Sequence, residues 1–114
     1  MATDSDVGHD QRECNADLAR AFGFLGKRWN GVILATLLSG PAGFAALRRA
    51  VNGISDSVLS ERLTELAKAG LVQRCVETGP PIGVEYGLTP SGQALLPALQ
   101  ELTTWAAQNL ATPE

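Results

Sequence analysis

Apolar residues recur every three or four positions along most of this 114-residue chain, the spacing that places side chains on one face of an α-helix. This pattern predicts helices over residues 14–25, 27–38, 43–50, 56–69 and 90–110. After Gly70 the pattern changes to two short apolar runs, which predict strands over residues 71–77 and 84–88. The loop 78–83 joins these strands and is rich in proline and glycine.

The order helix, turn, helix and hairpin between residues 43 and 88 is typical of a winged helix-turn-helix. Asn52 and Gly53 form the turn, where both residue types tolerate a left-handed backbone. Ser55 and Asp56 then supply a hydroxyl cap and a carboxylate at the positive end of the next helix. We therefore expect a mostly helical α+β fold, a winged helix-turn-helix with a two-stranded wing.

The helix predicted over residues 56–69 separates into an apolar and a polar stripe. Leu59, Leu63 and Leu66 form the apolar stripe. The opposite stripe carries short polar or charged side chains: Ser57, Ser60, Glu61, Thr64 and Lys68. A major groove accepts such a surface, so Ser57, Ser60 and Thr64 are candidate contacts to base edges or phosphates. The alternative for each hydroxyl is an ordinary solvated position.

Charge is distributed unevenly along the chain. The net charge is −3, yet no acidic residue occurs between Asp17 and Asp56. The basic residues of that interval are Arg20, Lys27, Arg28, Arg48 and Arg49. Because DNA affinity depends on local phosphate contacts, a basic face on an acidic body remains compatible with DNA binding and predicts modest non-specific affinity.

Lys27, Arg28 and Arg49 are the candidate phosphate contacts of that interval. Lys27 and Arg28 begin a predicted helix, whose N-terminus favours an anion. Arg49 projects away from the apolar face of its helix, whereas Arg48 lies at the edge of that face, where its stem can pack against the core.

Further candidates lie in and after the 56–69 helix. Ser55 precedes that helix, and Arg62 flanks its polar stripe and could reach the DNA backbone. Glu61 could accept a hydrogen bond from cytosine, or form a salt bridge with a neighbouring residue, and we favour the salt bridge. Arg74 starts the wing, where it would contact DNA or pair with Glu85.

The last helix exposes a broad apolar face. Thr89 and Pro90 cap and open it, and Pro97 is expected to kink it near its second turn. Its apolar residues are Leu95, Leu96, Leu99, Leu102, Trp105 and Ala106. Together with the apolar first helix, this face predicts a homodimer through the N- and C-terminal helices. The alternative is that both helices wrap a single core. Trp29, Phe44, Tyr86 and Trp105 are expected to pack in the core or the dimer interface.

Composition excludes several classes of protein. A hydrophobic content of 45% without low-complexity tracts predicts one folded domain, residues 13–112, after a flexible tail, residues 1–12. The polar N-terminus lacks the features of a signal peptide and no run is long enough to span a membrane, so we expect a cytoplasmic protein with no membrane partner. Two cysteines are too few for a disulfide scaffold.

Residues for metal or enzymatic chemistry are scarce. A metal site would need His9, Cys14 and Cys75, whose spacing matches no zinc pattern. His9 is the single histidine, and the chain has neither a phosphate-cradling loop nor an obvious carboxylate pair. We expect neither a cofactor nor an enzyme.

Cys14 stands at the start of the first predicted helix, where the helix dipole stabilises a thiolate, with Arg12 close in sequence. It also shares the apolar stripe of Leu18 and Phe22, so a buried and inert thiol is the alternative. Cys75 on the wing is expected to be structural. Because the last helix has no cysteine, any disulfide would join two copies of Cys14 or involve Cys75.

The chain resembles the HxlR-type winged-helix transcriptional regulators of bacteria from about Cys14 to Trp105. The resemblance rests on an ordered set of segments: 26–29 (GKRW), 40–41 (GP) with Phe44, 47–49 (LRR), 53–55 (GIS), Leu59, 62–63 (RL), Leu66, 70–72 (GLV), Arg74, 80–81 (PP), 84–86 (VEY), 88–89 (LT), Gly92 and Trp105. It implies a homodimer that binds double-stranded operator DNA. It also implies that Cys14 could sense oxidants or electrophiles, or that a small ligand could act at the dimer helices.

Two positions depart from the family pattern. Members often carry a basic residue just before the VEY segment, where this chain has Ile82 and Gly83, and often a basic residue at the position of Ser57. Both departures remove candidate phosphate contacts. An alternative function is therefore a winged-helix module for protein–protein contact with little DNA binding.

Overall fold

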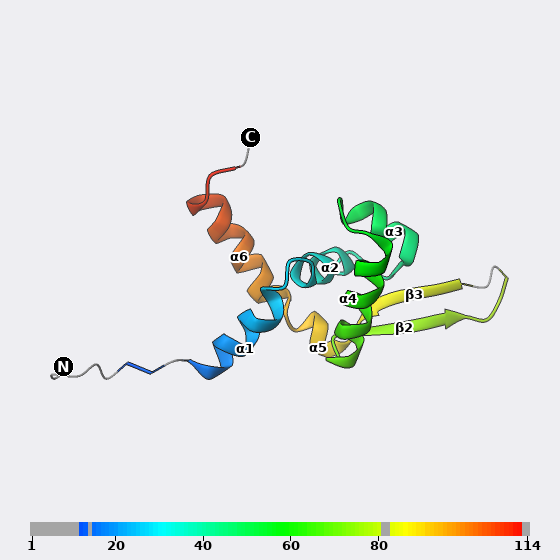
Figure 1. Cartoon of the computed structure of the whole chain (residues 1–114), viewed down its shortest axis with the longest axis horizontal. Helices are drawn as coiled ribbons and strands as arrows, with labels where there is room; N and C mark the ends of the chain where they lie inside the picture. Colours follow the sequence, from blue (N-terminus) through cyan, green and yellow to red (C-terminus); the bar gives the residue numbers. More distant parts are fainter. Residues whose placement is uncertain (1–11, 14, 81–82, 113–114) are drawn as a thin grey trace.

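The computed structural model describes residues 12–13, 15–80 and 83–112. Most of the predicted tail and Cys14 lie outside the described residues. The elements follow the predicted order (Figure 1). They are α1 (Ala16–Leu25), α2 (Asn30–Leu37), β1 (Ala42–Gly43), α3 (Phe44–Ala50), α4 (Asp56–Lys68), β2 (Val72–Glu77), β3 (Gly83–Leu88), α5 (Pro90–Gln93) and α6 (Leu96–Asn109).

The wing is an antiparallel hairpin to which a third strand is added. β2 pairs with β3 in a register that runs from Val72 opposite Leu88 to Glu77 opposite Gly83. The short β1 pairs with the other edge of β3, so the strand order is β1-β3-β2. The sequence did not predict β1, because two residues after a proline show no alternation. The mostly helical winged helix-turn-helix fold is confirmed.

The core lies where α2, α3 and α4 meet the base of the sheet. Leu59, Leu63 and Leu66 are buried, which confirms the predicted apolar stripe of α4. They pack with buried residues of the neighbouring elements: Ile33, Leu34, Leu37, Leu47, Val51, Ile54 and Val72. Burial of each large aliphatic side chain stabilises the fold by about 1.5–3 kcal/mol.

The predicted start of the second helix is corrected by the structure. α2 begins at Asn30, three residues after the predicted start, and Val32 is 47% exposed. Its buried face is Asn30, Ile33, Leu34 and Leu37, which follows the helical spacing from the true start.

The turn and ends of α4 form as predicted. Gly53 has a φ of +92°, and the Ser55 hydroxyl accepts a hydrogen bond from the Val58 N–H at 3.2 Å. α4 ends before Gly70, whose φ of +78° is a left-handed conformation that favours glycine. These two turns fix the direction of α4 relative to α3 and to the wing.

The predicted C-terminal helix is broken rather than kinked. α5 ends at Gln93 and α6 starts at Leu96, so Pro97 lies in the first turn of α6, where its missing N–H costs no hydrogen bond. The Thr89 hydroxyl accepts from the Gly92 N–H at 3.1 Å and donates to the Gly70 carbonyl at 2.6 Å. This residue therefore ties α5 to the end of α4.

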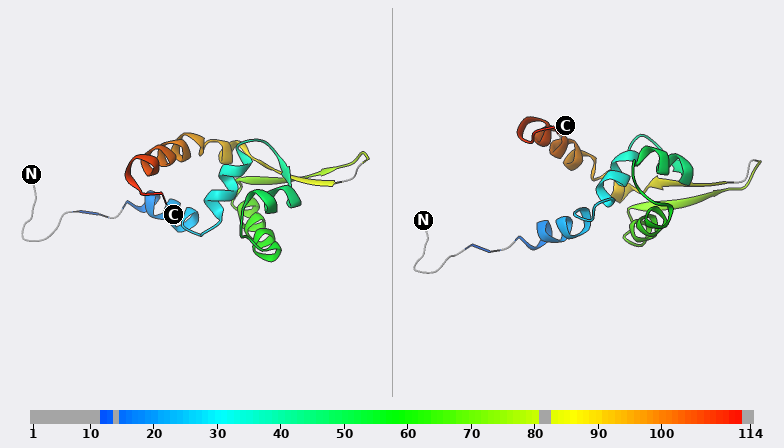
Figure 2. Two further views of the ribbon diagram at one scale, coloured as in Figure 1. Left: turned by 90° about the horizontal axis from the view of Figure 1, so that it is seen from above. Right: turned by 45° about the horizontal axis from the view of Figure 1, so that its top comes forward.

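α1 and α6 project from the end of the domain opposite the wing tip (Figure 1), and the right view of Figure 2 shows them as separate arms. Residues 16–23 of α1 are all exposed. Within the described residues, no helix has the length and apolarity to cross a membrane.

Candidate nucleic-acid interface

The polar stripe of α4 is uncovered. Ser57, Ser60, Glu61, Thr64 and Lys68 are all exposed. The helix carrying them is held from behind by the three buried leucines. The Thr64 hydroxyl donates to the Ser60 carbonyl at 2.9 Å, and the Ser55 and Ser57 hydroxyl oxygens are 3.4 Å apart. α4 thus presents a row of hydroxyls from its first turn onward.

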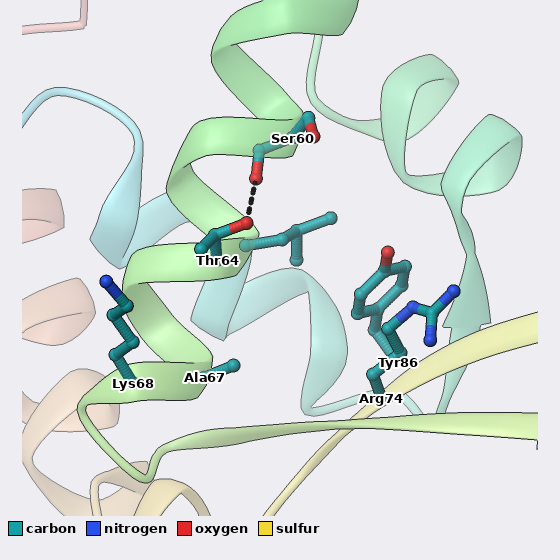
Figure 3. A pocket seen from close by; sticks show the side chains of 7 residues that line it. Ser60, Thr64, Ala67, Lys68, Arg74 and Tyr86 are labelled. Atoms are coloured by element: carbon teal, nitrogen blue, oxygen red, sulfur yellow. Dashed lines mark hydrogen bonds between the residues drawn. The ribbon is translucent and has the colours of Figure 1, made fainter.

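An open groove of about 600 Å³ lies between α4 and the wing (Figure 3). Ser60, Thr64 and Lys68 line it from α4, and Arg74 and Tyr86 line it from the sheet. Arg74 and Tyr86 are cross-strand partners, so their side chains share the face that is turned toward α4. The groove therefore adds two cations and a phenol to the hydroxyl row.

Lys68 and Tyr86 were not among the predicted site residues. Lys68 belongs to the predicted polar stripe, so the stripe itself was the signal that could have identified it. Tyr86 packs against the core as predicted but also borders the groove. Its pairing with Arg74 follows from the hairpin register, which the length of the wing loop left open.

Arg74 does not form the alternative pair with Glu85. The register places Glu85 opposite Cys75, on the other face of the hairpin. Within the described part of the chain, Arg74 makes no ion pair. Its guanidinium is therefore available to a ligand in the groove.

Glu65, which the sequence analysis did not single out, collects three donors on one side of α4. Its carboxylate accepts from Lys27 Nζ at 2.8 Å, from Arg62 Nη1 at 2.6 Å and from Asn30 Nδ2 at 3.0 Å. The hydrogen bond from Lys27, followed by that from Asn30, lowers the pKa of Glu65 from 4.5 to about 2, and the charge of Arg62 acts in the same direction. Glu65 is therefore ionised at neutral pH.

In this cluster, two predicted phosphate contacts, Arg62 and Lys27, bind Glu65. The Arg62 side chain is only 13% exposed and faces Glu65 and, at 3.7 Å, Glu61. Lys27 is half-exposed but bound to Glu65, and it precedes α2 rather than opening it. Lys27 and Arg28 therefore precede the helix that they were predicted to begin.

The remaining basic candidates lie on the surface. Arg28 is exposed and stacks on the Trp29 ring, with its guanidinium carbon 4.4 Å from the ring centroid. Arg49 is exposed in the last turn of α3 and makes no ion pair within the described residues. Arg48 binds Asp56, with Nε 3.0 Å from the carboxylate oxygen.

α1 and α6 bear a second, apolar surface away from this interface. Leu18, Phe22, Leu102 and Trp105 are about half exposed, between 45% and 55%. They line a hollow of about 840 Å³ between the two helices. Exposed apolar side chains gathered in this way mark a candidate interaction surface.

Cys75 is exposed on β2, which corrects the expectation of a structural thiol. The described residues contain no cluster of three side chains able to hold a metal ion. His9 and Cys14, the other two residues considered for such a site, lie outside the described part.

Comparisons with known proteins agree with this architecture. Residues 24–114 match the family described as HxlR-like helix-turn-helix. The HTH-type transcriptional regulator YodB of Bacillus subtilis is 43% identical over 88 residues, which are 77% of this chain and 79% of YodB. The uncharacterized regulator YvaP of the same organism is 39% identical over 99 residues, 87% of this chain and 92% of YvaP.

Solved structures show the same fold. The reduced form of YodB superposes with a TM-score of 0.78 at 38% identity and covers 90% of this chain and 100% of YodB. The quinone-bound form of YodB superposes with a TM-score of 0.72 at 40% identity, covering 84% and 99% of the two chains. The relatives are named transcriptional regulators, which confirms that the chain is not an enzyme. The chain belongs to the HxlR-like helix-turn-helix family of transcriptional regulators.

Proposed function

We propose that this regulator binds double-stranded operator DNA in a sequence-dependent manner, with α4 in the major groove. The observation that carries the proposal is the uncovered hydroxyl row of α4 beside a groove lined by Lys68 and Arg74. A helix with short polar side chains near its N-terminus can reach base edges, while cations beside it neutralise phosphates.

The proposed roles follow from placement. Ser57, Ser60 and Thr64 read base edges. Glu61 pairs with Arg62 at 3.7 Å, the salt bridge favoured from the sequence, and is not assigned a base. Arg28, Arg49, Lys68 and Arg74 contact phosphates. Ser55 holds the start of α4, whose first-turn N–H groups favour a phosphate. Lys27 and Arg62 act through Glu65 and are not assigned a phosphate.

Selection from a random-sequence duplex library provides the test. The bound duplex should lose affinity steeply as salt is raised, because phosphate contacts release counterions. Arg49→Ala should weaken all sequences to a similar extent, whereas Ser60→Ala should change the preferred bases. Equal effects of the two substitutions on every sequence would contradict this division of roles.

We infer that the binding unit is a homodimer formed through α1 and α6. The half-exposed apolar side chains of these helices support this inference, since a second copy would remove them from water. A two-fold pair would present two copies of α4 to half-sites about 34 Å apart.

We propose further that Cys14 or the apolar helices receive an effector. The support comes from the relative YodB, whose structures include reduced and quinone-bound forms. An electrophile would add to the Cys14 thiolate, which stands just before α1. In the test, a quinone should release the wild-type protein from its duplex, Cys75→Ser should respond alike, and Cys14→Ser should not respond.

A protein–protein contact module is the second candidate. The net charge of −3 and the uncharged Ser57 on the exposed face of α4 favour it. If no duplex is selected at low salt, this candidate replaces DNA binding.

A further inference from the structure

Asn30 is a buried polar residue that is only partly satisfied by hydrogen bonds. Among the described residues it is the one fully buried polar side chain, and its Oδ1 has no hydrogen-bond partner. A buried acceptor without a partner destabilises the fold. The two hydrogen bonds that Nδ2 donates must therefore account for an asparagine at this position.

The two bonds from Nδ2 reach two different helices. One goes to the Phe24 carbonyl in the last turn of α1, at 3.1 Å, and the other to the Glu65 carboxylate in α4, at 3.0 Å. Lys27, in the linker after α1, binds the second oxygen of the same carboxylate at 2.8 Å. The end of α1 is thus joined to the middle of α4 by polar contacts that have fixed directions.

α1 has few other attachments to the domain. Residues 16–23 are exposed, and only Phe24 and Leu25 at its C-terminal end pack against the core cluster. A movement of α1 is therefore passed to the rest of the domain at Phe24, whose carbonyl accepts the hydrogen bond from Asn30.

We propose that Asn30 is a positioning residue that transmits movement of α1 to α4 through Glu65. The proposal rests on the proposed DNA-binding function and supplies a route for its regulation. When the Phe24 carbonyl shifts, Asn30 either loses one of its two bonds or carries the Glu65 carboxylate with it. Coupling of this kind is reciprocal, so DNA bound to α4 must also restrain α1.

Asn30→Leu separates coupling from stability. It removes both amide bonds together with the unsatisfied Oδ1 and keeps the branched shape and the number of heavy atoms of the side chain, so the fold should be kept. Asn30→Ala removes the same bonds and is measured in parallel in case the leucine disturbs the packing. The matched control is Thr36→Val, because Thr36 also lies in α2 but donates only within that helix, to the Val32 carbonyl at 2.9 Å.

The experiment measures amide hydrogen exchange of residues 16–29 in the full chain, with and without a saturating selected duplex. Protein concentration is high enough that the oligomeric state, checked by sedimentation, does not change when DNA is added. Wild type and Thr36→Val should exchange about fivefold more slowly in this segment with DNA, the lower end for coupled sites. In Asn30→Leu and Asn30→Ala this slowing should disappear while α4 is still protected.

The possible failures can be told apart. The coupling role is overturned if wild type binds the duplex but the exchange of α1 does not change. It is also overturned if DNA slows this exchange in both Asn30 variants as much as in wild type. In either case DNA binding stands. If no duplex binds the wild type, the proposed function fails and the coupling proposal fails with it.

Discussion

At the scale of single residues, the acid response of Glu65 can be predicted from its three donors. The pKa of Glu65 is about 2 in the folded chain against 4.5 ordinarily. A lowered pKa stabilises the fold fully above about pH 4.5, and this stabilisation is lost as pH falls toward 2. Urea unfolding of wild type and Glu65→Gln should therefore differ most between pH 5 and 7 and converge between pH 4.5 and 2. A difference that stays constant down to pH 2 would contradict the assigned cause.

Sequence reasoning predicted residues whose role depends on their own helix and missed those whose role depends on contacts distant in the chain. The exposed stripe of α4 follows from helical spacing alone, and so does its buried leucine face. Asn30, by contrast, acquires its role from Glu65, which lies 35 positions further along the chain. Arg62 and Lys27 were assigned to DNA because the spacing of residues along the chain does not show that the Glu65 carboxylate binds both side chains.

At the scale of elements, the junction of α4, β2 and α5 leaves no room for a Cβ at Gly92. A Cβ on Gly92 would collide with the Leu71 carbonyl oxygen and lie 3.1 Å from Leu88 Cδ2. Gly92→Ala should lower the free energy of unfolding by about 1–3 kcal/mol, because the backbone must move. Thermal unfolding of the variant and wild type measures this loss of stability. Gly23→Ala in α1 meets no atom within 4 Å and should be neutral or stabilising, by about 0.5–1 kcal/mol. Equal effects of the two substitutions would refute the packing argument.

Element boundaries were predictable where a cap marks them. Ser55 and Gly70 mark the two ends of α4, and both were read correctly from the sequence. The start of α2 was misplaced because its N-cap residue, Trp29, makes no side-chain capping hydrogen bond and so gives no such signal. The break after Gln93 could not be derived from Pro97, because a proline fits a kink or the first turn of a helix equally well.

At the scale of the whole molecule, the arms formed by α1 and α6 explain why so small a domain leaves large apolar side chains in water. Phe22 and Trp105 are 55% and 53% exposed, and they border the same hollow. If a second copy fills that hollow, a charge placed there must separate the pair, because an unpaired carboxylate is costly to bury. Phe22→Asp should therefore sediment as a monomer at micromolar concentration.

The same substitution should weaken binding to a two-half-site duplex far more than binding to a single half-site, because a monomer cannot engage sites about 34 Å apart. Val76→Asp is the matched control, since Val76 is 54% exposed but lies on the wing strand, outside the hollow. It should remain dimeric. If Phe22→Asp also stays dimeric, the two copies meet through another surface, and α1 is not part of the dimer interface.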